Sequence, residues 1–209
     1  MNSVEETDNK IKELKIVILG DVGVGKTNII TRYLNNQFNE DSITTNGASY
    51  MMKKIVIDNV TYRLNVWDTA GQEKFHSVTK MLIQDVNILI LCYSIVNRPT
   101  FENLDYWYKI ITDICGKKLV LAVVGNKNDL YENEEVKEEE GKSYAEKHHA
   151  YFKLVSAKCS KGGIDELFDD LLKEYIMKFS DDDEDKNEDN NSLRLDDKLN
   201  VKRGKKCCK

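Results

Sequence analysis

The sequence predicts an α/β fold in which a six-stranded, mostly parallel sheet with one antiparallel edge strand is flanked by five helices. Short β-branched apolar runs alternate along the chain with longer stretches of helical periodicity. A glycine-rich segment, residues 20–27, separates the first apolar run from the first helical stretch. Two further apolar runs meet at Asp58 and Asn59, a pair that favours a hairpin turn. Such alternation places ligand-binding loops at the carboxyl ends of the parallel strands.

The elements follow in order from these patterns. We expect strands at residues 13–20, 48–58, 60–67, 87–94, 119–125 and 151–156. We expect helices at residues 26–36, 73–83, 99–115, 138–148 and 163–178. The second and third strands form the hairpin, so one of them is the antiparallel edge. The remaining strands form parallel βα units.

Composition divides the 209 residues into a polar extension at 1–12, one domain at 13–179 and a tail at 180–209. A domain of this size can bury a single core. Hydrophobic residues make up 41% of the chain, but no apolar run approaches the 18 residues of a membrane span. The charged start is unlike a signal peptide, and Asn2 excludes N-myristoylation, which requires glycine there. The net charge of −5 argues against nucleic-acid binding, and the five cysteines do not resemble a disulfide framework, so we expect a reducing cytosol.

The glycine-rich segment contains a complete phosphate-loop pattern, GxxxxGK[ST], from Gly20 to Thr27. Glycines let successive backbone N–H groups and the helix N-terminus face phosphate oxygens. Lys26 would reach the β- and γ-phosphates, and the Thr27 hydroxyl would hold Mg²⁺. The alternative is a strand-to-helix turn that binds nothing. The strand before the loop and the helix after it favour a phosphate site.

Two downstream motifs indicate which base is bound. Asn126, Lys127 and Asp129 form an NKxD pattern at the end of an apolar strand. An ionised Asp129 carboxylate can accept hydrogen bonds from N1–H and the 2-amino group of guanine, whereas adenine offers it a lone pair. Ser156-Ala157-Lys158 supplies a second loop at the same sheet edge. The pattern therefore predicts a guanine site.

A third motif lies between these two, in the segment Val66–Glu73. Asp68 ends an apolar strand, where its carboxylate can bind Mg²⁺ through water. Gly71 can bring a bare N–H to the γ-phosphate, and Gln72 is placed to orient an attacking water.

With these motifs, the chain resembles the Ras-like small GTPases, and most of all the Rab branch, from Leu14 to Met177. The resemblance implies a P-loop NTPase domain that binds GTP and GDP with Mg²⁺ and hydrolyses GTP. It implies that Phe38 stacks on guanine, that Thr45 closes over Mg²⁺ and the γ-phosphate, and that Gln72 and Lys26 are catalytic. An alternative for Phe38 is an ordinary core aromatic. The metal ligands are expected to be Thr27, Thr45 and Asp68. The expected nucleotide-binding residues are Asp21, Val22, Gly23, Val24, Gly25, Lys26, Thr27, Asn28, Phe38, Thr45, Gly71, Asn126, Lys127, Asp129, Ser156, Ala157 and Lys158.

The resemblance also implies partners and a location. A monomeric Rab-like switch in vesicle trafficking requires an exchange factor, a GTPase-activating protein, effectors of the GTP state, and chaperones for prenylation and membrane extraction. Effectors would read Tyr50, Trp67 and Leu82, the last of which replaces an aromatic residue. We expect the protein on the cytoplasmic face of an intracellular membrane, cycling with the cytosol.

The tail carries the expected anchor. Residues 181–191 are almost all acidic or amide residues, which predicts a disordered spacer. A basic cluster follows at 202–206, beside Cys207 and Cys208. A CaaX box is excluded because Lys206 stands four residues from the end, so paired cysteines carrying prenyl chains are the expected lipidation sites. The alternative is an unmodified dithiol on a solvated tail, and the final Lys209 departs from the usual Rab endings.

Val22 is the departure with the largest expected consequence. Family members usually carry glycine or serine at this position, close to the γ-phosphate. A β-branched side chain is stiff, so it should crowd the attacking water and an incoming arginine finger without preventing GTP binding. We therefore expect a switch biased toward GTP. The alternatives are a widened loop with ordinary turnover, a GTP-binding effector-recruiting module with negligible hydrolysis, and a phosphotransferase or ATPase, which Asp129 opposes.

Overall fold

A computed structural model describes residues 11–40, 45, 47–69, 80–115 and 118–179. Its strands are β1 (Lys12–Leu19), β2 (Ala48–Ile57), β3 (Val60–Thr69), β4 (Ile88–Ser94), β5 (Val120–Asn126) and β6 (Tyr151–Leu154). Its helices are α1 (Lys26–Asn35), α3 (Arg98–Glu102), α4 (Leu104–Thr112), α5 (Glu138–Lys147), α6 (Ile164–Phe179) and the 3₁₀ helix η2 (Asn128–Asn133).

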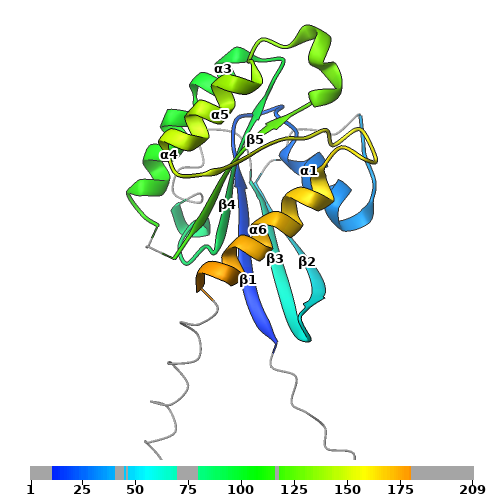
Figure 1. The fold of residues 1–209 in the computed structure, drawn as a ribbon, viewed down its shortest axis with the longest axis vertical. Coiled ribbons are helices and arrows are strands. Elements are labelled where there is room, and N and C mark those ends of the chain that lie inside the picture. The colour runs from blue at the N-terminus through cyan, green and yellow to red at the C-terminus, as the bar shows by residue number, and fades with distance from the viewer. Residues whose placement is uncertain (1–10, 41–44, 46, 70–79, 116–117, 180–209) are drawn as a thin grey trace, which may run out of the picture.

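The six strands form one sheet in the order β2-β3-β1-β4-β5-β6 (Figure 1). Every neighbouring pair is parallel except β2 with β3, so β2 is the antiparallel edge. Asp58 and Asn59 join these two strands with φ angles of 49° and 63°, as a turn with two left-handed residues requires. The predicted fold class and its antiparallel edge are confirmed.

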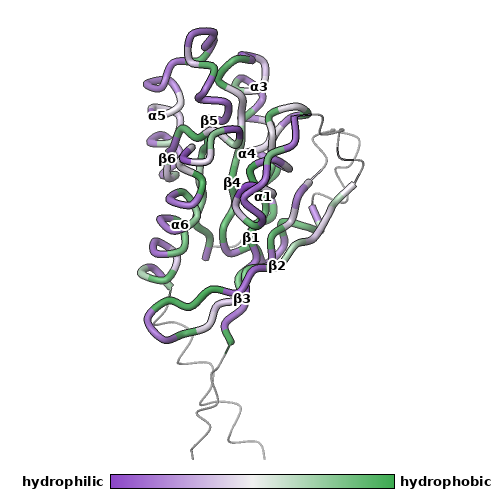
Figure 2. Tube along the Cα trace, turned by 90° about the vertical axis from the view of Figure 1, so that its right-hand side faces the viewer, coloured by the Kyte–Doolittle hydropathy of each residue, from purple (hydrophilic) through white to green (hydrophobic). Residues whose placement is uncertain are grey.

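Alternate residues of β1 face two separate cores, which explains its continuous apolar sequence. Ile16 and Ile18 face the core that α1 and α6 cover, whereas Val17 and Leu19 face the core that α4 and α5 cover. The molecule therefore has helix layers on both faces of the sheet (Figure 1). Figure 2 shows hydrophobic residues concentrated along the central strands, while hydrophilic residues recur along the outer helices. This burial holds the carboxyl ends of β1, β3, β4 and β5 at one edge.

One predicted helix was wrong in its extent. The segment expected as a single helix at 99–115 is divided into α3 and α4. Asn103 separates them with φ −78° and ψ −1°, and the hydrogen bond from the Trp107 N–H to its carbonyl is long at 3.4 Å. The Asn103 side chain instead donates to Asp21 in the loop after β1. Most of the helix expected at 73–83 lies outside the described residues. Within the described part of this segment, residues 80–82 are helical.

Candidate nucleotide site

The loop between β1 and α1 begins the site. Gly25 has φ +95°, a conformation that side chains rarely adopt, and stands directly before α1. A Cβ at Gly25 would lie 2.4 Å from Nδ2 of Asn126, which donates to the Val24 carbonyl at 2.8 Å. Glycine therefore allows the loop to pack against the end of β5.

Lys26 lies beneath this loop and is 5% exposed. Its Nζ donates to the carbonyls of Gly20 at 2.7 Å and Asp21 at 2.8 Å. Burial lowers the pKa of Lys26, and the nearby carboxylates of Asp68 and Asp21 oppose that shift. A buried ammonium ion with two neutral partners is suited to an anionic ligand, which would stabilise its charge.

Thr27, Thr45 and Asp68 meet at one end of the loop. The Thr27 hydroxyl donates to Oδ2 of Asp68 at 2.7 Å and lies 2.9 Å from the Thr45 hydroxyl, which is 3.3 Å from the same Oδ2. Asp68 is 1% exposed, and its Oδ1 has no hydrogen-bond partner among the described residues. Burial raises the pKa of Asp68, whereas the hydrogen bond from Thr27 and the charge of Lys26 lower it. Two hydroxyls beside a carboxylate with a free oxygen fit Mg²⁺, which prefers oxygen ligands.

Asn126 and Ser156 form the other end of the site, near the carboxyl ends of β5 and β6. Oδ1 of Asn126 accepts from the Ala157 N–H at 3.2 Å, so this side chain ties the loop after β6 to the loop after β1. The Ser156 hydroxyl donates to Oδ1 of Asp129 at 2.6 Å and accepts from the Cys159 N–H at 3.2 Å. Asp129 is thus held by one oxygen, and its carboxylate remains able to accept from a ligand.

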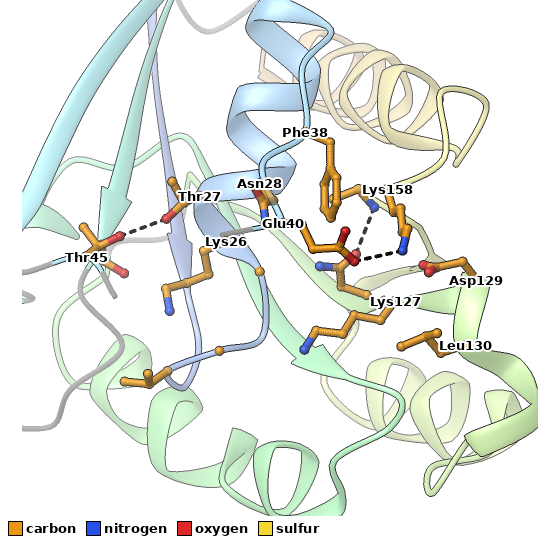
Figure 3. A pocket seen from close by; sticks show the side chains of 16 residues that line it. Lys26, Thr27, Asn28, Phe38, Glu40, Thr45, Lys127, Asp129, Leu130 and Lys158 are labelled. Carbon is orange, nitrogen blue, oxygen red and sulfur yellow. Dashed lines mark hydrogen bonds and ion pairs between the residues drawn. The ribbon is translucent and has the colours of Figure 1, made fainter. Parts of the chain in front are cut away.

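A pocket of about 410 Å³ connects the two ends, which is within the usual range for small-molecule sites (Figure 3). Figure 3 shows Thr27 and Thr45 at one end, and Asp129, Leu130 and Lys158 at the other. The expected nucleotide-binding residues that line it are Val22, Gly23, Gly25, Lys26, Thr27, Asn28, Phe38, Thr45, Asn126, Lys127, Asp129, Ala157 and Lys158.

Three expected residues support the pocket without lining it. The Asp21 carbonyl holds Lys26, the Val24 carbonyl holds Asn126, and the Ser156 hydroxyl holds Asp129. Phe38 lines the pocket and also packs against the core formed with α1 and α6.

Other expected residues lie outside the described part of the chain. These are Gly71, Gln72, Cys207 and Cys208.

The expected effector residues are only partly at the surface. Tyr50 is 49% exposed, its ring centroid lies 5.1 Å from that of Trp67, and its hydroxyl donates to Asn65. Leu82 is only 5% exposed, which corrects its expected surface position. An aliphatic side chain, unlike a tyrosine, has no polar tip to hold it at the surface, and Leu82 is buried.

The structure adds residues that the sequence did not reveal. Glu40, Thr69 and Leu130 also line the pocket, and Glu40 forms an ion pair of 3.1 Å with Lys158. Arg32 of α1 donates to the carbonyls of Ala157 and Lys158 and so holds the loop after β6. For Glu40 and Leu130, the sequence signal is nearness to a motif residue: Glu40 follows Phe38 by two residues, and Leu130 follows Asp129 directly.

A phosphate loop between β1 and α1 of a parallel sheet, with ligand-facing loops at the strand ends, defines a P-loop nucleotide-binding protein. Comparison with known proteins narrows this class. A model of the Ras family matches residues 15–177. The chain is 42% identical to the Ras-related protein Rab-21 of Homo sapiens over 162 residues, which cover 78% of this chain and 72% of that protein.

Two other relatives agree. Identity is 38% to the Ras-related protein Rab-11B of Dictyostelium discoideum over 158 residues, 76% of this chain and 71% of that protein. Identity is 32% to the Ras-related protein Rab5A of Oryza sativa subsp. japonica over 169 residues, 81% of this chain and 83% of that protein. The chain therefore belongs to the Ras family and is a Rab-like small GTPase.

Proposed function

We propose that this protein is a membrane-anchored GTP–GDP switch of vesicle trafficking whose cycle is biased toward the GTP state by Val22. The observation that carries the proposal is the position of Val22, which is 41% exposed and lines the same pocket as Lys26 and Thr45. Its side chain is therefore not withdrawn into the core. Because members of the family bind guanine nucleotides and Mg²⁺, these are the expected ligands.

The described residues would act together on GTP. Asp129 would select guanine with the carboxylate oxygen that Ser156 does not bind, and Lys26 would keep its two carbonyl partners and direct the remaining N–H of its Nζ to phosphate oxygens. Thr27 and Thr45 would hold Mg²⁺ directly, and Asp68 would hold it through water. Mg²⁺, when bound, neutralises the charge that develops on the phosphate oxygens. Gln72, outside the described residues, would orient the attacking water.

Val22 would slow this reaction by occupying space beside the γ-phosphate. Valine has one strongly restricted side-chain torsion, so it cannot rotate away from a neighbour as serine can. Crowding by an added apolar group costs about 1–3 kcal/mol. If this cost falls on the transition state, hydrolysis slows by roughly 5- to 160-fold.

Release of the γ-phosphate would free Thr45 and Gly71, so the segments that contain them would relax and the effector surface would change. Tyr50 and Trp67 support such a surface, because the exposed Tyr50 ring on β2 contacts the partly buried Trp67 ring on β3. Regulation by an exchange factor, a GTPase-activating protein, effectors and lipid-handling chaperones is part of this proposal.

Membrane attachment would come from the tail. No helix among the residues that the structure describes is long and apolar enough to cross a membrane. Prenyl chains on Cys207 and Cys208, with the basic residues beside them, would supply the two signals that stable anchoring needs.

Single-turnover hydrolysis of γ-labelled GTP tests the bias. The native chain should be slow, and Val22→Ser should be faster by roughly 5- to 160-fold. Val56→Ser is the matched control, because it makes the same chemical change at a 69% exposed position of β2 that does not line the pocket. This control should hydrolyse GTP as the native chain does.

Each outcome separates the alternatives. Equal and ordinary rates in the native chain and Val22→Ser would contradict the bias and indicate a loop that tolerates valine. No detectable hydrolysis by either would instead favour a GTP-binding module that recruits effectors without turnover.

A further inference from the structure

The side chain of Asp21 points away from the pocket, toward the junction between α3 and α4. Its Oδ1 accepts two hydrogen bonds, from Nδ2 of Asn103 at 2.7 Å and from the indole Nε1–H of Trp107 at 2.8 Å. We infer that these three residues form a clamp that positions the phosphate loop, with Asn103 and Trp107 acting as positioning residues for nucleotide retention. The inference rests on the proposed function of the pocket as a guanine nucleotide site.

Both the backbone carbonyl and the side-chain carboxylate of Asp21 accept hydrogen bonds, so the position of its side chain can set the shape of the loop. Its carbonyl accepts from Nζ of Lys26 at 2.8 Å, while its carboxylate is bound by the two donors of the clamp. Asp21 stands between Gly20, whose carbonyl also accepts from Lys26, and Val22, which lines the pocket. A shift of the Asp21 side chain would therefore move the backbone around Lys26.

The two donors are fixed by the packing of the helices. Trp107 is 2% exposed and lies on the buried face of α4 with Leu104, Ile110 and Ile111. Asn103 is the single residue between α3 and α4, and its side chain reaches the loop. The break in the predicted helix therefore has a consequence for the site, because it places an amide donor beside Asp21.

The clamp also controls where a negative charge lies. A free carboxylate in the phosphate loop would repel the phosphates of a nucleotide. Hydrogen bonds to an ionised acceptor are stronger than those between neutral groups, so the two donors hold Asp21 in its outward orientation. Indole N–H can only donate, which matches it to the acceptor oxygens of a carboxylate.

Dissociation of labelled GDP from the full-length protein with Mg²⁺ tests the inference. Trp107→Phe keeps an aromatic ring and removes the donor, and it should accelerate GDP release at least about tenfold, because a hydrogen bond to a charged acceptor is lost. Asn103→Ala removes the other donor at a half-buried junction and should also accelerate release. This second variant serves if Trp107→Phe fails to fold.

A double-mutant cycle distinguishes positioning from mere structural support. Once Asp21→Ala has removed the acceptor, Trp107→Phe should have no further effect on GDP release. Ile110→Val is the control: it disturbs the same buried face of α4 without removing a donor, so it should lower stability and leave the release rate unchanged.

Unchanged release in both Trp107→Phe and Asn103→Ala, or the same acceleration by Trp107→Phe with and without Asp21, would overturn the inference. These results presuppose a native chain that retains GDP. A native chain that retains neither GDP nor GTP would contradict the proposed function itself and remove the basis of the clamp.

Discussion

Replacing Gly25 by alanine tests how tightly the phosphate loop is packed against Asn126 at the end of β5. The new Cβ would meet Nδ2 of Asn126 at 2.4 Å, closer than any real contact of this kind. Asn126 is 2% exposed and is held by the Val24 carbonyl and the Ala157 N–H, so it cannot swing aside cheaply.

The expected loss of unfolding free energy in Gly25→Ala has two parts. Alanine at φ +95° carries left-handed strain of about 1–2 kcal/mol. The clash with Asn126 adds an overpacking cost of about 1–3 kcal/mol. Gly25→Ala should therefore lower the free energy of unfolding by roughly 2–5 kcal/mol.

Gly23→Ala is the matched control. Gly23 also has a left-handed φ, +78°, but a Cβ there would meet nothing within 4 Å. It should lower the free energy of unfolding by only about 1–2 kcal/mol, from backbone strain alone. Denaturant unfolding of both variants, at one fixed concentration of GDP and Mg²⁺, gives the comparison. Equal losses in the two variants would refute the packing argument, because they would leave no cost for the clash.

Two further predictions concern other contacts. Ser156→Ala removes the 2.6 Å hydrogen bond to Asp129 and should accelerate GDP dissociation about tenfold; an unchanged rate would show that Asp129 needs no such support. Glu140 forms a two-point ion pair with Arg98, whose hydrogen bonds lower the pKa of Glu140 from 4.5 to about 2. Its contribution to stability is therefore present above about pH 4.5 and lost as the pH falls through about 2. The difference in melting temperature between the native chain and Glu140→Gln should shrink over that range, whereas the exposed neighbour variant Glu139→Gln should show no such trend.

Local patterns predicted the parts of this protein that local chemistry determines. The β-branched runs, the glycine-rich loop and the Asp58-Asn59 turn each specify their own backbone, and the observed sheet, with its antiparallel edge, agrees with them. The strand ends then bring Lys26, Thr27, Asp68 and Asn126 to one edge, because parallel strands share a direction.

Long-range contacts could not be predicted in this way. The helix expected at 99–115 has good helical periodicity throughout, and its division is accompanied by a bond from Asn103 to Asp21, 82 residues away. Leu82 was assigned to the surface from the family pattern, but its own apolar side chain packs inward. The pairing of Glu40 with Lys158 across 118 residues likewise has no local signal.

The nucleotide that the protein carries in cells tests the central claim most directly. Cells expressing the chain, Val22→Ser and Val56→Ser would be labelled with radioactive phosphate, and the nucleotide released from each isolated protein would be separated into GTP and GDP. A switch biased by Val22 predicts mostly GTP on the native chain and on Val56→Ser, with a shift toward GDP on Val22→Ser. Mostly GDP on the native chain, at the same ratio as on Val22→Ser, would contradict the account.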